Sequence, residues 1–223
     1  MGILADSEVR MGQVREVTSL EMLDAALCED RALDAAEQEA ALGLLMIEPT
    51  IWPISVLPVR LVTGEPLRTR IAARAALTAE LMRALRPHAH AAEAVARIER
   101  WLLAQCYANG CMVGECAHAG VAVMRYLAAS GRPDAPERLA RHIEGIRQRH
   151  DGSGRWQGLP FFYTLLALAE IGSQAANEEL RYTAPACERA LVRIQPDDPY
   201  TPCRQTILRR ALTFNNHRRP SHG

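Results

Sequence analysis

The sequence contains one pattern twice: a helix, a loop with glycine, and a small-residue-rich apolar helix that ends at another glycine. The first copy spans residues 98–131 and the second spans residues 143–172, so the closing glycines, Gly131 and Gly172, are 41 residues apart. A recurrence of this length is typical of helical-repeat proteins, because one helical hairpin cannot bury its own apolar face and stacks on its neighbours. The pattern therefore predicts an all-α fold built from helical hairpins.

Length and charge limit the class of protein. The 223 residues, 48% of them hydrophobic, are enough to bury a core without disulfides or metal, and 26 basic residues balance 26 acidic ones. With no net charge, nucleic acid is not expected as a partner. The amino terminus lacks an export signal, and no apolar run is long enough to cross a membrane. We expect a cytoplasmic protein without a membrane span, whose six cysteines are reduced thiols.

The amino-terminal third is expected to hold two helices and a crossing loop. Thr18 with Glu21 forms a candidate capping box, and Asp30 precedes a helical run to about Met46. The next stretch, residues 48–66, contains four prolines and is predicted to be extended. Pro66 is predicted to open a helix that reaches Leu85.

The helical hairpins are expected to follow. Predicted helices cover residues 89–105 and 116–129, a further one starts at Asp134, and an apolar one runs from Pro160 to Gly172. Two more starts are predicted at Pro185 and at Thr201. We therefore expect a single helical-repeat domain over residues 1–213, with the amino-terminal helices and crossing loop in 1–88, the α/α hairpins in 89–213, and a disordered tail in 214–223.

The second copy, DGSGRW followed by PFFYTLLALAEIG, resembles the repeat of the terpenoid cyclase and protein prenyltransferase superfamily. The resemblance covers about residues 89–214 and implies a partial or small α/α toroid, with inner helices around a central cavity. It implies a hydrophobic, isoprenoid-like small molecule as ligand, and cyclisation or transfer as the reaction if the protein is an enzyme. The expected cavity-lining residues are aromatic, although aromatic side chains that open a buried helix are also typical of a packed core: Tyr126, Trp156, Phe161, Phe162 and Tyr163.

The catalytic motifs of that superfamily are not carried over. The DxDD acid of the cyclases and the DDxxD diphosphate motif are both absent from the chain. Of the prenyltransferase zinc ligands, only the cysteine matches, at Cys116, because Gly114 stands in place of the aspartate and Tyr163 in place of the histidine. The resemblance therefore leaves the catalytic residues unknown.

Four soft ligands lie close together in the first copy, with the spacing C-x4-C-x4-C-x-H: Cys106, Cys111, Cys116 and His118. Thiolates and imidazole around a glycine-containing loop form a candidate metal site, with zinc as the possible cofactor. The same cysteines are also typical of small packing residues between helices. A third interpretation is a reactive thiol at Cys116, near a helix N-terminus and His118.

His150 and Asp151 are a further candidate for a catalytic base and its orienting carboxylate, although Asp151 before Gly152 is also a typical turn residue. Three hypotheses of function remain open. They are a terpenoid cyclase-like protein that binds an apolar molecule, a non-catalytic helical-repeat scaffold for a protein partner or a second copy, and a metal- or thiol-dependent protein that uses the cysteine cluster.

Overall fold

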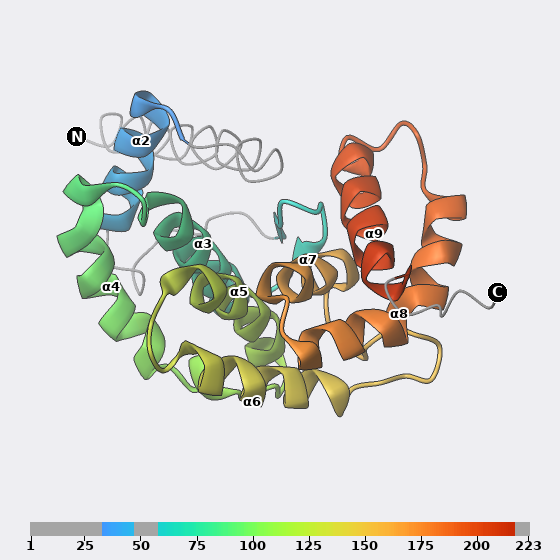
Figure 1. Cartoon of the computed structure of the whole chain (residues 1–223). Helices are drawn as coiled ribbons and strands as arrows, with labels where there is room; N and C mark the ends of the chain where they lie inside the picture. The colour runs from blue at the N-terminus through green and yellow to red at the C-terminus, as the bar shows by residue number, and fades with distance from the viewer. Residues whose placement is uncertain (1–32, 47–57, 217–223) are drawn as a thin grey trace, which may run out of the picture.

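The computed structural model describes residues 33–46 and 58–216. Most of these residues are helical, and two short strands pair in one antiparallel hairpin. In chain order the elements are α2 (Ala35–Met46), β1 (Val59–Arg60), β2 (Pro66–Leu67), α3 (Arg70–Leu85), η2 (Ala89–Ala91), α4 (Ala92–Ala104), η3 (Cys106–Asn109), α5 (Glu115–Ser130), α6 (Ala135–Arg147), α7 (Phe161–Ile171), α8 (Gln174–Arg193) and α9 (Thr201–Asn216) (Figure 1). The predicted all-α class is confirmed.

Several predicted ends are confirmed by local geometry. Gly131 and Gly172 follow α5 and α7 in the left-handed conformation, with φ of 62° in both cases. Asp134 precedes α6, and Thr201 starts α9. The helix α9 extends to Asn216, which is past the first residues of the predicted tail. The predicted starts at Thr18 and Asp30 lie outside the described residues; α2 begins after Asp34, whose carboxylate accepts the amide of Glu37 at 2.9 Å.

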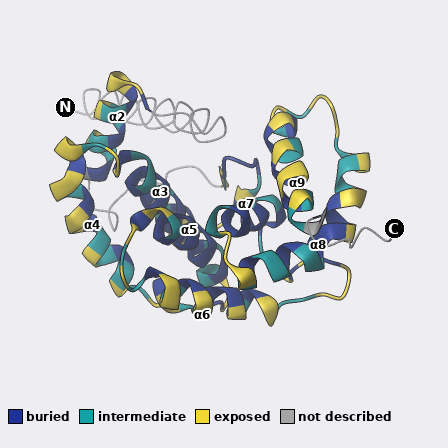
Figure 2. Ribbon diagram, in the orientation of Figure 1, coloured by how far each residue is buried: buried dark blue, intermediate teal, exposed yellow. Residues whose placement is uncertain are grey.

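The centre of the molecule is formed by α5 and α7. Each residue of α5 from Ala119 to Leu127 is buried, and α5 packs against α3, η3, α6 and α7 (Figures 1 and 2). The outer helix α4 buries only one face, through Val95, Ile98 and Leu102. The prediction that the two apolar helices are buried is therefore confirmed, and their side chains fill the space between the neighbouring helices.

An ion-paired network crosses this apolar centre. Arg125 of α5 is 1% exposed and donates two hydrogen bonds to Glu170 of α7, both at 2.8 Å. It also donates to Glu80 of α3, as does the hydroxyl of Tyr163. Burial alone would raise the pKa of the Glu80 carboxyl, but Arg125 and Arg83 reverse this effect and leave the pKa below its usual value. The network joins three helices and favours the ionised form of the Glu80 carboxyl.

A short hairpin, not predicted from the sequence, precedes α3. Pro66 lies in β2, paired with Arg60, so the prediction that Pro66 opens the helix is wrong. The helix begins instead at Arg70, because the hydroxyl of Thr69 accepts the amide of Ala72 at 3.3 Å. A proline is tolerated at such a place because a hairpin edge leaves one amide position unpaired.

Glu65 of this hairpin caps α7 from a distant part of the sequence. Its carboxylate accepts the backbone amides of Phe162 and Tyr163 at 3.1 and 2.8 Å, and the hydroxyl of Thr63 at 3.0 Å. Pro160, at the N-cap of α7, offers no side-chain oxygen for these amides. Glu65 therefore supplies the cap that the local sequence lacks, and it ties the hairpin to the central helices.

The structure also corrects the prediction of a helix start at Pro185. Pro185 lies inside α8, which continues to Arg193. A proline inside a helix removes one backbone hydrogen bond and bends the helix, and Figure 1 shows α8 changing direction along its length. The segment predicted to start at Pro185 is therefore the second half of one bent helix that begins at Gln174.

Candidate metal centre: a cluster of three cysteines

The cysteine cluster is built by a tight loop between η3 and α5. Cys106 begins η3, and Gly110 and Gly114 follow with φ of 88° and 54°. These positive φ values favour glycine and allow a tight turn at each of the two positions. The amide of Cys111 bonds the carbonyl of Cys106 at 3.3 Å, and the amide of Cys116 bonds the carbonyl of Val113 at 3.1 Å. The loop therefore returns Cys116 to the side of Cys106.

The three sulfur atoms come close enough to share one metal ion. The Sγ atoms of Cys106, Cys111 and Cys116 lie within 4.8 Å of one another, and those of Cys106 and Cys116 are 3.5 Å apart. A tetrahedral zinc ion with Zn–S bonds of about 2.3 Å separates its sulfur ligands by about 3.8 Å. Cys106 is exposed, and the other two cysteines are half-buried. The cluster thus opens to solvent on one side.

The thiols of the cluster are not equivalent. The backbone amide of Val113 lowers the pKa of Cys111 against the effect of burial, and the thiols of Cys116 and Cys106 lower it further. Burial and the two neighbouring thiols raise the pKa of Cys116 to about 12. Without a cation, the loop therefore favours a negative charge on Cys111, and this charge opposes ionisation of Cys116. A bound cation would remove this opposition, since metal ligation requires thiolates.

Arginine side chains hold the loop in place. Arg149 donates hydrogen bonds to the carbonyl of Met112 and, at 2.8 Å, to the carbonyl of Gln157. It therefore joins the cysteine loop, residues 106–116, to the loop before α7. Arg138 of α6 donates to the side chain of Asn109 at 2.8 Å. The side chain of Met112 is buried. The cluster is therefore supported by α6 and by the loop after it, which sequence spacing alone does not show.

His118 does not join the cysteines. It is not among the donor atoms that lie within 4.8 Å of one another. Residues two positions apart on a helix are separated by about 200° around its axis, so Cys116 and His118 point to different sides of α5. Burial and the nearby Arg149 lower the pKa of His118, and Glu115 acts against them. Three of the four predicted ligands are therefore brought together.

The predicted pair of His150 and Asp151 does not form. Asp151 caps its own turn by accepting hydrogen bonds from the amides of Ser153 and Arg155 at 2.8 and 3.0 Å, as a typical turn residue does. The imidazole of His150 instead lies 2.6 Å from the carboxylate of Glu179 in α8. Glu179, which sequence reasoning missed, is 1% exposed. The local sequence signal for Glu179 is that an acidic residue occupies the buried face of an amphipathic helix.

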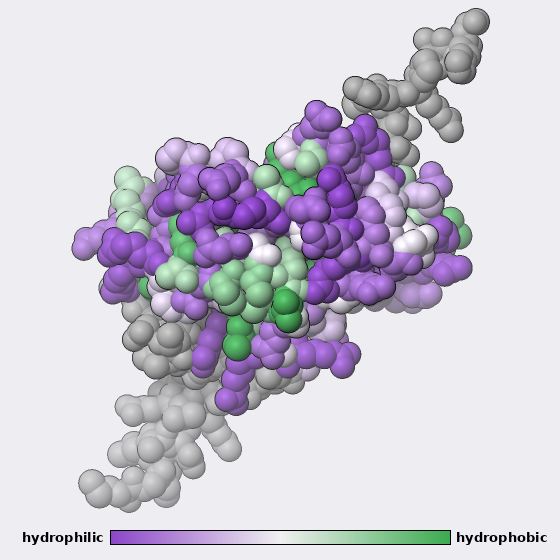
Figure 3. All heavy atoms as spheres, turned by 90° about the horizontal axis from the view of Figure 1, so that it is seen from below, coloured by the Kyte–Doolittle hydropathy of each residue, from purple (hydrophilic) through white to green (hydrophobic). Residues whose placement is uncertain are grey.

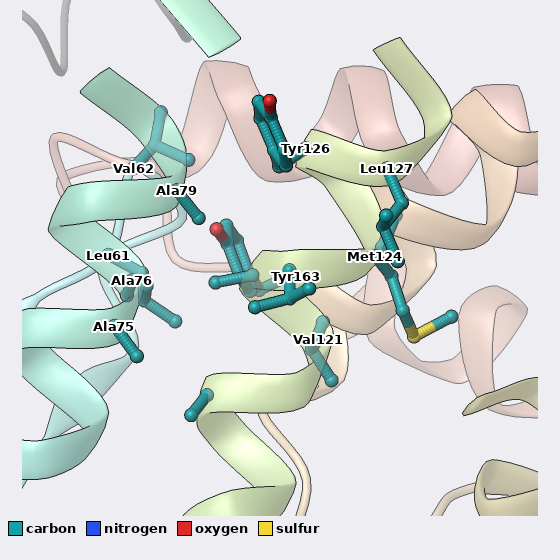
Figure 4. Close-up of a cluster of buried hydrophobic side chains, with 14 of the residues drawn as sticks. Leu61, Val62, Ala75, Ala76, Ala79, Val121, Met124, Tyr126, Leu127 and Tyr163 are labelled. Carbon is teal, nitrogen blue, oxygen red and sulfur yellow. The ribbon is translucent and has the colours of Figure 1, made fainter. Parts of the chain in front are cut away.

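The five aromatic residues expected to line a cavity are involved in packing. Tyr126 and Tyr163 are 0% exposed, and Trp156 and Phe161 are 4% and 5% exposed. Tyr126 donates to Glu99 at 2.5 Å, and Tyr163 points toward α3 in the cluster shown in Figure 4. Phe162 is half-buried and lies under the guanidinium of Arg204. These contacts favour the core role for the aromatic residues and give no support to a central chamber.

The surface gives little support to a scaffold role. The large hydrophobic side chains exposed in residues 33–46 and 58–216 lie on three separate elements, α3, the cysteine loop and α8: Ile71, Val113 and Val192. On the face shown in Figure 3, hydrophilic side chains predominate around a smaller hydrophobic area. An extended binding face normally presents a larger apolar patch.

In comparisons with protein families, characterised proteins and solved structures, the chain has no match. Within the described part of the chain, no helix has both the length and the apolar character that crossing a membrane requires.

Proposed function

We propose that this protein binds one soft metal ion, with zinc as the favoured ion, through the thiolates of Cys106, Cys111 and Cys116. The observation that carries the proposal is the convergence of three sulfur atoms within 4.8 Å of one another. Three thiols that only fill space between helices would lie in the core, whereas here one is exposed and the other two are half-buried.

The donor set selects the class of metal. Thiolates favour Zn²⁺ and Cu⁺, whereas Mg²⁺ and Ca²⁺ prefer oxygen ligands. Zinc is favoured because three sulfur ligands leave one position of a tetrahedral site free, and the exposed Cys106 gives the cluster contact with solvent. Metal sites with such a free position exchange a water or a small molecule at the ion. The proposed site is therefore one that holds zinc and presents it to an incoming ligand.

A second candidate function is thiol redox chemistry, favoured by the 3.5 Å distance between the sulfur atoms of Cys106 and Cys116. The two thiols would form a disulfide by exchange with an oxidised disulfide partner, which accepts two electrons and two protons and leaves as two thiols. Metal binding and this oxidation compete, because both use the same sulfur atoms.

The test measures the metal content of the full chain purified under reducing conditions, by elemental analysis and native mass spectrometry. We expect about one zinc per chain, and loss of that zinc in Cys106→Ser, Cys111→Ser and Cys116→Ser. Cys187→Ser is the matched control, because Cys187 is buried in α8 and hydrogen-bonds Thr183. Zinc retained by all three variants, or no metal bound after zinc is supplied, would overturn the proposal. In the latter case, a Cys106–Cys116 disulfide found by peptide mapping would favour the redox function.

A further inference from the structure

A basic cleft lies on the surface formed by α8, the start of α9 and the segment around the start of α7. It encloses about 260 Å³. Four of its lining residues are arginines, and four others offer apolar or aromatic surface. The arginines are Arg155, Arg189, Arg193 and Arg204, and the apolar group is Phe162, Ala186, Ala190 and Ile194. None of these residues belongs to the cysteine cluster, so the inference is independent of the metal site.

The positive charge of the cleft is largely uncompensated. Asp198 is the only carboxylate among the lining residues, and it pairs with Arg204 at 2.7 Å. Arg189 donates to the backbone carbonyl of Ser153, which carries no charge. Within the described residues, Arg155, Arg189 and Arg193 have no ion pair with a carboxylate. Like charges four residues apart on a helix repel, so Arg189 and Arg193 of α8 favour an anion between them.

Two of these arginines lie over aromatic rings, those of Phe162, which lines the cleft, and of Phe161, which is buried and does not line it. The guanidinium of Arg204 lies over the ring of Phe162 at 5.0 Å, and that of Arg155 lies over the ring of Phe161 at 4.1 Å. Arg204 also donates to the carbonyl of Thr63 at 2.7 Å, which fixes it against the hairpin. Flat guanidinium and aromatic groups stack well on the planar rings of a ligand. The cleft thus combines a planar surface, formed by Arg204 and Phe162, with arginines that have no carboxylate partner within the described residues.

We propose that this cleft binds the phosphate monoester of a small molecule with a planar ring, of the chemical class of a mononucleotide. Arg189 and Arg193 bind the phosphate by paired charge-assisted hydrogen bonds, which the fork of a guanidinium suits. The ring lies against Phe162 and the apolar side of α8. The volume of about 260 Å³ is slightly below the range of about 300–1,000 Å³ that is usual for small-molecule sites, so the proposed ligand is no larger than a single nucleotide.

The experiment measures the binding of three probes to the full chain by isothermal titration calorimetry: AMP, adenosine and inorganic phosphate. We expect AMP to bind at least about tenfold more tightly than either of its parts, because only AMP uses both the arginines and the planar surface. Arg193→Gln and Arg189→Gln should each weaken AMP binding by about tenfold or more. Both side chains are exposed, so the variants are expected to fold, and circular dichroism checks this.

Arg209→Gln is the matched control, because Arg209 is exposed on α9 and does not line the cleft. It should bind AMP as the unmodified chain does. The proposal is overturned if AMP does not bind, if inorganic phosphate binds as tightly as AMP, or if Arg193→Gln and Arg209→Gln have the same affinity. It is also overturned if a polyanion such as heparin binds and AMP does not, since this would indicate a site for extended acidic partners.

Discussion

The buried imidazole of His142 makes the fold sensitive to acid. His142 lies in α6, is 0% exposed and packs against Gly120 of α5, where an added Cβ would lie 3.4 Å from the ring. Neither ring nitrogen makes a well-formed hydrogen bond within the described residues. Burial lowers the pKa of His142 to about 4, with Arg141 and Arg138 acting in the same direction and the backbone of Ala108 acting against them. The folded protein therefore keeps this histidine neutral where an unfolded chain protonates it.

The size of the effect follows from the two pKa values. Since the folded pKa is below the unfolded value of 6.5, stability is fully present above about pH 6.5 and is lost as the pH falls toward about 4. The difference corresponds to about 3 kcal/mol of unfolding free energy. Leucine has a similar volume and no titratable group. Replacing His142 with leucine should therefore remove the imidazole's part of the pH dependence of the unfolding free energy and leave the part that comes from the carboxylates.

The assay is urea unfolding followed by circular dichroism, repeated between about pH 7.5 and about pH 4.5. His142→Leu should lose less stability over this range than the unmodified chain, by about 2 to 3 kcal/mol. His90→Leu serves as the control, because His90 is exposed in η2. An unchanged pH dependence in His142→Leu would refute the reasoning, because the buried imidazole would then not be linked to folding.

Three further predictions concern the helix junctions, and denaturant unfolding checks each. Arg125→Met should cost about 3 to 5 kcal/mol, because the buried carboxylate of Glu80 and the half-buried one of Glu170 lose their shared cation and keep only Arg83; adding Glu80→Gln and Glu170→Gln should restore part of this. Glu65→Gln should cost about 1 to 2 kcal/mol, because an amide turns a donor toward one of the two capped amides of α7. Gly64→Ala should cost more than about 2 kcal/mol, because φ is 77° and the added Cβ would lie within van der Waals overlap of Tyr200.

Each of these predictions has an outcome that contradicts it. An Arg125→Met variant as stable as the unmodified chain would show that the network does not hold buried charge. For Glu65→Gln, the contradicting result is a loss of unfolding free energy no larger than that of Glu137→Gln, in which an exposed carboxylate is replaced. Gly43→Ala is the control for Gly64, since Gly43 lies within α2 with nothing near its Cβ position. It should be neutral or slightly stabilising, and an equal loss in both variants would contradict the account.

The parts of the fold that the sequence predicts are those decided by local chemistry. Gly131 and Gly172 mark helix ends because a left-handed glycine acts within one turn. Asp134 precedes α6 as predicted, but its carboxylate makes no capping hydrogen bond and pairs instead with Arg132 and Arg138. Pro66 and Pro185 mislead because partners distant in sequence decide their surroundings. Pro66 pairs in a hairpin docked on α7 and α9, and the tertiary packing of α8 outweighs the hydrogen bond that Pro185 removes.

The candidate site was predictable to a similar degree. Three cysteines around a glycine-containing loop indicate convergence, and the loop geometry brings them together. His118 does not join the cysteine cluster, and the sequence already gives the reason. It lies two positions after Cys116 on the same helix and therefore faces another side. Arg125, in an otherwise apolar helix, was the available signal of a buried ion pair. Its partners, Glu80 and Glu170, lie 45 residues away on either side and required the structure.

X-ray absorption spectroscopy of the zinc-loaded full chain tests the central claim most directly, because it reports the atoms bound to the metal. The account predicts three sulfur neighbours at about 2.3 Å and one lighter neighbour, nitrogen or oxygen, at about 2.0 to 2.1 Å. A shell made only of nitrogen and oxygen atoms would contradict the claim that Cys106, Cys111 and Cys116 form a metal centre.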